Sequence, residues 1–273
     1  IVIRKKIMAN FVFSQLVGQT IAFNPSTDVL VFSANTNAAE LAFSVVGADV
    51  LVKLGTSSTG VRLSATNYSQ LATSNFSFPN GSQFFVGTSA NDVVTGSSAG
   101  DFFAFDVFSA SQGGSDQLSG GTGADVFALG GNLSASDQIY GGTEAIGQPA
   151  KIDEIKLAGQ YSSTVILQST TIREIEKFSF GEGGIVKLKL HNDTFSGVQA
   201  SEILFDAAVQ KQTDGLLLDG SAVTTGKMKV TGGAGQDQIT GGAQDDSIQG
   251  GAGQDIIIGG AGNDTIKGGL DAD

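Results

Sequence analysis

The chain has no cysteine and no tryptophan, and its 273 residues include one histidine and 3 prolines. The absence of cysteine excludes disulfides, thiolate metal sites and thiol nucleophiles. A two-histidine zinc motif is excluded too, and any Ser–His–acid triad has to use His191, which lies in LKLHNDTF, a predicted strand end and turn. We therefore expect a surface or structural role for His191, and we predict that this chain is not an enzyme.

Long apolar runs are also missing. No stretch approaches the roughly 18 apolar residues of a membrane-spanning helix, so no span is predicted. The N-terminal IVIRKKIMAN is basic but is followed by neither an apolar run nor a small-residue cleavage site, so it does not read as a secretory signal peptide. Met8 is a candidate true start.

Basic residues are scarce. Lys and Arg total 15 against 27 Asp and Glu, which gives a formal charge of −12. The acidic excess is concentrated in residues 87–160 and 232–273. A phosphate backbone would be repelled there, so nucleic acid is not an expected partner, whereas a divalent cation is.

Glycine, phenylalanine and small or β-branched residues are abundant. The chain has 39 Gly and 18 Phe and is 40% hydrophobic, which is too apolar for a disordered chain. Plentiful Val, Ile, Thr and Ser, with little Leu, Lys and Glu, favour strands and turns over helices. The composition predicts an all-β fold.

Pattern divides the chain into four segments. Residues 8–86 form a β-rich N-terminal region, with runs such as DVLVKL and GVRLSA. Residues 87–157 hold a first Gly/Asp-rich array. Residues 158–231 contain strand-like runs that we expect to continue the same stacked coils. Residues 232–273 hold a second, regular array that stops within a repeat, which predicts a fragment of a longer protein.

The second array reads GGAGQDQIT, GGAQDDSIQ, GGAGQDIII and GGAGNDTIK. Glycines allow a tight turn that points carbonyl oxygens to one side, and the sixth position adds a carboxylate. The eighth position, as in Ile239 and Ile248, faces a core. Carboxylates stacked at strand spacing repel by about 3 kcal/mol per pair. Carbonyl and carboxylate oxygens suit Ca²⁺, so we predict that the coils stack only with metal.

The first array is less regular. Its repeats read GTSANDVVT, GSSAGDFFA, SQGGSDQLS, GGTGADVFA and NLSASDQIY, with insertions between some of them.

Two further features do not follow the repeat pattern. In the second array Gln244 replaces a glycine and Asp245 adds an acid, which predicts a weaker or distorted site. The acidic pairs Asp153/Glu154 and Glu174/Glu176 are of the type glycosidases use, but we expect them on solvated faces.

These motifs resemble the RTX (haemolysin-type calcium-binding repeat) family. The resemblance implies a right-handed parallel β-roll or β-helix in which two nonamers make one turn and several Ca²⁺ ions lie between successive turns. The implied pairs are Asp92–Asp116, Asp101–Asp125, Asp116–Asp137, Asp237–Asp255, Asp246–Asp264 and Asp255–Asp273. The implied metal-ligating residues are Asp92, Asp101, Asp116, Asp125, Asp137, Gly232, Gly233, Gly235, Asp237, Gly241, Gly242, Asp246, Gly250, Gly251, Gly253, Asp255, Gly259, Gly260, Gly262, Asp264 and Asp273.

The resemblance also implies a function. It suggests a calcium-dependent structural or cell-surface protein of a Gram-negative bacterium, exported by type I secretion, such as a surface-layer (S-layer) subunit, a sheath component or an adhesin. Self-association or contact with cell-surface components is then expected. The alternative is the β-roll module of a secreted protease, lipase or phosphatase whose catalytic domain lies outside this chain. A pore-forming toxin would need helical segments, which the sequence does not predict.

Overall fold

The structure is a computed structural model that describes residues 8–105, 114–143, 151–168, 171–195, 202–271 and 273. Strands dominate it, and the described part contains one α-helix, α1 (Phe13–Leu16). The other helical segments are short 3-10 turns: η1 (Ala38–Glu40), η2 (Tyr68–Gln70), η3 (Thr73–Asn75) and η4 (Asn192–Phe195). The predicted all-β class is confirmed.

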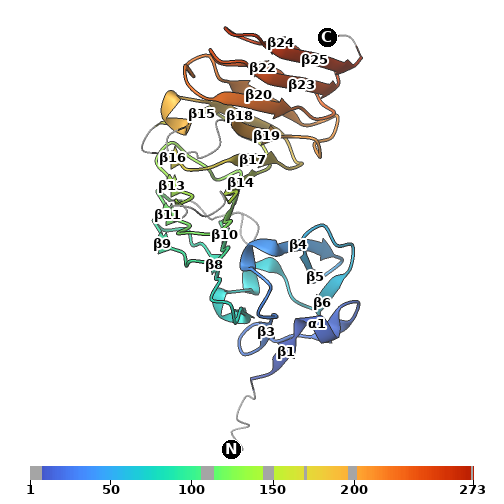
Figure 1. The fold of residues 1–273 in the computed structure, drawn as a ribbon. Coiled ribbons are helices and arrows are strands. Elements are labelled where there is room, and N and C mark those ends of the chain that lie inside the picture. Colours follow the sequence, from blue (N-terminus) through green and yellow to red (C-terminus); the bar gives the residue numbers. More distant parts are fainter. Residues whose placement is uncertain (1–7, 106–113, 144–150, 169–170, 196–201, 272) are drawn as a thin grey trace, which may run out of the picture.

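A solenoid of stacked coils forms the larger part of the molecule (Figure 1). One face is a nine-stranded sheet in which every neighbouring pair is parallel. Its strands are β8 (Phe84–Val86), β10 (Phe102–Ala104), β12 (Val126–Gly130), β14 (Glu154–Leu157), β17 (Lys177–Phe180), β19 (Glu202–Asp206), β21 (Lys227–Thr231), β23 (Ser247–Ala252) and β25 (Thr265–Leu270).

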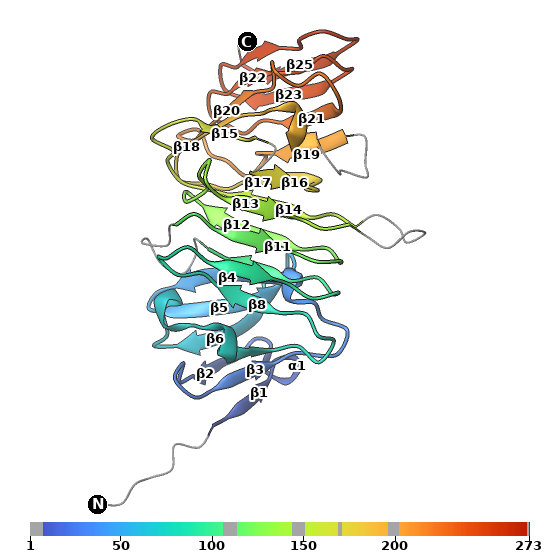
Figure 2. The ribbon, with the colours of Figure 1, turned by 90° about the vertical axis from the view of Figure 1, so that its left-hand side faces the viewer.

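Two parallel sheets face it across the core. The first opposing sheet contains β9 (Val93–Thr95), β11 (Gln117–Ser119), β13 (Gln138–Tyr140) and β16 (Ile172–Arg173). The second opposing sheet contains β15 (Val165–Ile166), β18 (Ile185–Lys189), β20 (Gly215–Asp219), β22 (Gln238–Thr240) and β24 (Ile256–Ile258). Figure 2 shows the coils stacked between the two chain ends. The chain alternates between the sheets, so each coil is one turn of a parallel β-roll, as expected.

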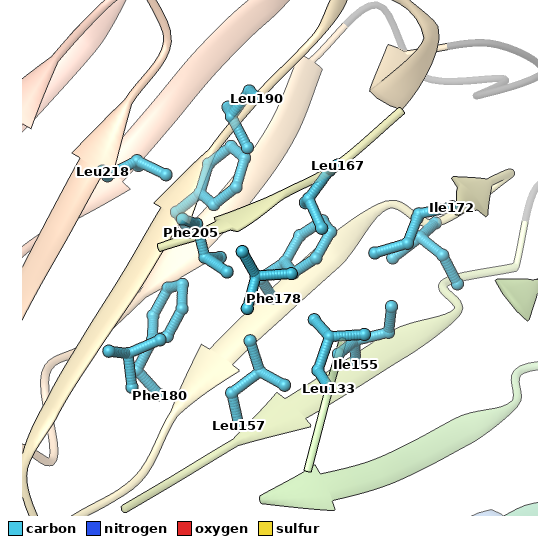
Figure 3. Packing of buried hydrophobic residues seen from close by; sticks show 14 of the residues in the cluster. Leu133, Ile155, Leu157, Leu167, Ile172, Phe178, Phe180, Leu190, Phe205 and Leu218 are labelled. Atoms are coloured by element: carbon cyan, nitrogen blue, oxygen red, sulfur yellow. The ribbon is translucent and has the colours of Figure 1, made fainter. Parts of the chain in front are cut away.

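The solenoid core is built from the strand residues that point inward. Ile239 and Ile248 are 1% exposed, and the strand register places them opposite Ile257 and Ile266 of the next coil. Ile266 is 46% exposed because it belongs to the last described coil. Aromatic and aliphatic side chains fill the middle coils (Figure 3). This inward stacking is what the eighth motif position predicts.

The paired phenylalanines of the first coils serve two cores. Phe103 points into the solenoid and stacks on Phe127 with ring centroids 4.6 Å apart. Its neighbour Phe102 points outward and joins a second core together with Phe84 and Val126. The outer face of β8, β10 and β12 is therefore covered by the N-terminal region, which the sequence alone does not predict.

The N-terminal region supplies the rest of that second core. A parallel sheet contains β1 (Asn10–Val12), β3 (Val29–Val31) and β7 (Phe76–Ser77). A mixed sheet contains β2 (Thr20–Ala22), β6 (Gly60–Ser64), β5 (Asp49–Leu54) and β4 (Leu41–Val46). The strand β8 lies within the segment 8–86 but belongs to the solenoid. No helix among the described residues has the length and apolarity to cross a bilayer.

Candidate metal centre

Turns join the strands along two edges of the solenoid. Outbound turns lead from the nine-stranded sheet to an opposing sheet, as at 232–237 between β21 and β22. Return turns lead back, as at 241–246 between β22 and β23. Each motif aspartate from Asp92 to Asp264 stands directly before a strand, at the end of its turn. Stacking therefore aligns these carboxylates along the two edges.

Hydrogen bonds link each aspartate to the coil before it. At the return edge, the backbone N–H of Asp101 donates to Asp125 Oδ1 over 2.7 Å, and that of Asp246 donates to Asp264 Oδ1 over 2.9 Å. The outbound pairs have the same contact, with N···Oδ1 distances of 2.9 Å for Asp92–Asp116, 3.0 Å for Asp116–Asp137, 2.9 Å for Asp237–Asp255 and 3.2 Å for Asp255–Asp273. The structure thus brings together all six pairs that the resemblance implies. We call these rows the carboxylate ladders.

The second carboxylate oxygen usually accepts from its own turn. The N–H of Gly233 donates to Asp237 Oδ2 over 2.8 Å, and that of Gly242 donates to Asp246 Oδ2 over 2.7 Å. Asp255 differs, because its Oδ2 is buried and has no hydrogen-bond partner. A buried anionic oxygen without a donor is costly, so this position calls for a cation or another donor.

Burial and like charge disfavour the ionised aspartates. Desolvation raises the pKa of the Asp101, Asp116, Asp246 and Asp255 carboxyls, and it raises the pKa of Asp237 to about 6. Neighbouring carboxylates in the same ladder act in the same direction, as Asp255 does on Asp237. A bound cation would remove both penalties, so the charged ladders favour metal.

The first glycine of a motif is required by close approach between coils. A Cβ at Gly232 would overlap the carbonyl oxygen of Gly250 and Oδ2 of Asp237. Gly241 stands in the same relation to Gly259 and to its own aspartate. Later glycines in the array are required by conformation, since Gly251, Gly253, Gly260 and Gly262 have φ of 115°, 110°, 103° and 112°. The remaining implied glycine, Gly235, lies against the backbone of Asp214.

These oxygens fit calcium better than the other common metal ions. The described residues contain no group of three or more His, Cys, Asp or Glu side chains that could hold a metal ion. The turns offer instead carboxylates in pairs beside backbone carbonyl oxygens, the mixed oxygen set that Ca²⁺ accepts in flexible geometry. Zn²⁺ prefers nitrogen and sulfur ligands, which these turns lack. The carboxylates and carbonyl groups named above would hold the ion.

The turn with Gln244 keeps the same hydrogen bonds as its neighbours. Asp246 accepts from Met228 N–H over 2.8 Å, just as Asp237 accepts from Leu216 N–H over 2.8 Å. Gln244 itself donates through Nε2 to the carbonyl oxygen of Thr224. The backbone geometry around Asp246 is therefore regular despite the two substitutions.

Three acids outside the expected set extend the ladders. The N–H of Asp125 donates to Asp153 Oδ1 over 2.8 Å, and the N–H of Asp153 donates to Glu176 Oε2 over 2.9 Å. Asp214 accepts from the N–H groups of Gly183 and Gly184 over 3.2 and 3.0 Å.

A sequence signal for these three acids exists. Each precedes by two residues a buried apolar residue of a strand, as Asp153 precedes Ile155. The expected solvated face is wrong for Asp153, which is 3% exposed because its carboxylate lies inside the ladder.

One pentapeptide, GSSAG at 96–100, has the G-x-S-x-G form of a hydrolase nucleophile elbow. It lies in the return turn between β9 and β10, whereas the elbow joins a strand to a helix. The serine at the nucleophile position is Ser98, and the hydroxyl of its neighbour Ser97 donates to Asp101 Oδ1 over 3.0 Å. His191 is exposed at the start of the η4 turn, where its backbone N–H donates to Thr194 Oγ1 over 3.2 Å.

Comparison with protein families gives one match. The model of the RTX calcium-binding nonapeptide repeat matches residues 111–132, 231–266 and 242–273. No curated protein and no solved structure matches the chain. The matched segments contain Asp116, Asp125 and the whole second array, so the family match and the ladders coincide there. These segments of the chain are therefore RTX calcium-binding nonapeptide repeats.

Proposed function

We propose that this protein is a calcium-dependent, exported structural or cell-surface protein, such as a surface-layer subunit, a sheath component or an adhesin. The observation that carries the proposal is the pair of carboxylate ladders. They connect coil to coil, so most acidic side chains of the arrays serve the stack itself. We propose no catalytic role for this chain.

The chain's own residues link folding to metal. Each aspartate accepts most strongly from the preceding coil and from its own turn when it is ionised, yet ionisation is opposed by burial and by the next carboxylate. Bound calcium supplies the positive charge that offsets this repulsion. Without it, the coils of the second array are held by the backbone pairing of their strands and by the narrow row of isoleucines at the eighth motif position.

This linkage suits export. Calcium sites of extracellular modules typically bind at about 10⁻⁴–10⁻³ M, far above cytosolic calcium. A chain with such sites stays extended in the cell, where a type I secretion channel can thread it, and folds outside. RTX repeats are typical of exported proteins, which supports this localisation.

Two exposed isoleucines support self-association. Ile256 and Ile258 are 59% and 56% exposed on the outer face of β24. The corresponding positions of β22 are Gln238 and Thr240, which are polar. A hydrophobic pair at positions that are otherwise polar is the type of surface that a second copy covers.

Sedimentation velocity across a calcium titration, with magnesium as the control ion, tests the proposal. We expect calcium to compact the chain and then to produce large species that EDTA reverses. The double variant Ile256→Gln/Ile258→Thr, which copies β22, should compact normally but remain monomeric. A compact monomer from the unmodified chain would favour the alternative, a β-roll module of a secreted enzyme. A chain equally compact in EDTA would refute the calcium-linked mechanism.

A further inference from the structure

A cavity of about 320 Å³ lies between strand β4 of the N-terminal region and the nine-stranded sheet of the solenoid. Strand β4 contributes Leu41 and Phe43 to one wall, and the outer face of the nine-stranded sheet contributes Phe102 and Ala128. The exposed Val209 also lines it, from an outbound turn. The volume falls at the low end of the range for small-molecule sites, and most of the lining is apolar, as in such sites.

The aromatic residues that line the cavity pack against one another. The ring of Phe43 meets that of Phe102 edge to face, with centroids 6.1 Å apart. Phe102 also stacks on Phe84 at 5.6 Å within the second core. Aromatic side chains fixed in this way offer a preformed surface for an apolar group.

The polar side of the cavity carries one excess positive charge. Glu154 Oε1 lies 3.0 Å from Lys177 Nζ and also accepts from the Ser179 hydroxyl. Lys156 Nζ lies 3.5 Å from Glu154 Oε2 and 6.0 Å from the centroid of Phe102. One carboxylate thus faces two ammonium groups, and the cluster keeps one net positive charge, with Lys156 nearest the apolar wall.

We propose that this cavity binds a small molecule with an apolar body and one carboxylate group, such as a medium-chain fatty acid. The apolar body lies against Phe43 and Phe102, and the carboxylate pairs with Lys156. A neutral ligand would leave the ammonium group unused, and a cationic one would be repelled by it. The site is independent of the carboxylate ladders, which lie at the edges of the coils.

Fluorescence titration of the calcium-loaded chain tests this proposal. The aryl sulfonate dye 8-anilinonaphthalene-1-sulfonate is the probe, and decanoate and decanol are the competitors. We expect decanoate to displace the dye with an affinity about tenfold or more above that of decanol, the size of effect expected for a charge-assisted contact. Circular dichroism in the same samples checks that the chain is folded.

Two variants locate the site. Lys156→Met keeps most of the aliphatic length of the side chain and should weaken decanoate binding about tenfold, leaving decanol unchanged. Val209→Glu, at an exposed position, should also weaken decanoate binding. Lys187→Met, on the outer face of the second opposing sheet, is the matched control and should bind like the unmodified chain. Equal affinity for decanoate and decanol, an unchanged Lys156→Met variant, or no displacement at millimolar decanoate would each overturn the proposal.

Discussion

In the second array, successive coils follow at an interval of 18 residues, whereas in the first array the interval varies from 21 to 28 residues. The turns nevertheless share one geometry. At Gly96, Gly120 and Gly141, as at Gly232, a Cβ would overlap the aspartate of the same turn and a carbonyl oxygen of the next coil. These turns thus keep the first glycine and the aspartate, and they tolerate extra residues between them.

The second motif position does not require glycine. The second array has Gly233 and Gly242 there, while the first two repeats of the first array have Thr88 and Ser97. Ser97 fits because its backbone N–H still donates to the aspartate of its own turn, as the N–H of Gly242 does. The difference between the arrays is therefore one of composition at replaceable positions, and the ladder is common to both.

Removing calcium should give the largest difference in stability between the solenoid and the N-terminal region. We expect EGTA to lower the hydrogen-exchange protection of residues 202–271 by about 100-fold or more, because metal-binding free energy is folding free energy in such sites. Residues 41–64 form an antiparallel set whose apolar core lies mainly within the N-terminal region, so they should keep most of their protection. Hydrogen-exchange mass spectrometry measures both. Equal loss in the two regions would contradict this contrast.

Substitution of a first-position glycine should be damaging in either array. Gly250→Ala and Gly120→Ala each place a methyl group against an aspartate oxygen and the backbone of the next coil. We expect each to reduce the free energy of unfolding by about 1–3 kcal/mol in calcium. Gly131→Ala is the control, because a Cβ there meets its nearest atom at 3.5 Å. Urea denaturation of the calcium-loaded chains compares them, and similar midpoints for all three variants would refute the close-approach argument.

An acid outside the repeats should matter as much as a repeat acid. Asp214→Ala removes the acceptor of three backbone N–H groups, those of Gly183, Gly184 and Lys211. We expect a loss of about 1–3 kcal/mol in unfolding free energy. Glu202→Ala, at an exposed strand end, should be close to neutral. Thermal denaturation in calcium distinguishes them, and a neutral Asp214→Ala would confine the ladder's importance to the repeats.

Acid should partly replace calcium in the second array. The pKa of Asp237 in the folded chain is raised to about 6, above the value of about 3.9 expected in the unfolded chain. Protonation therefore favours the folded state, and this stability is lost as pH rises from about 4 to 6. In EDTA, ordered structure should increase modestly as pH falls from 7 to 5. Circular dichroism detects the change, which Asp237→Asn should reduce; a decrease in order over that range would contradict it.

The sequence predicts the repeat geometry well because the repeat length sets the coil length. A period of two nonamers alone places Asp237 beside Asp255 and Ile239 beside Ile257. The repeat length does not predict the positions of Asp153 and Glu176. Longer turns change the number of residues between successive ladder acids, although both side chains occupy the same place in the stack. The repeat length does not predict the surroundings of the outward-facing Phe102 either. Alternation indicates that the strand has two apolar faces, but it does not indicate that the N-terminal region covers one of them.

The ladders also determine how the molecule would respond to mechanical tension. A pull on the two ends acts along the stack, so the links between coils are loaded one after another, in series. The coil with the weakest link gives way first, and its neighbours keep their own bonds. Extension should therefore proceed in small, reversible steps, each releasing about one coil. A protein held at a cell surface would then lengthen under load and shorten again when calcium binds once more to the released turns.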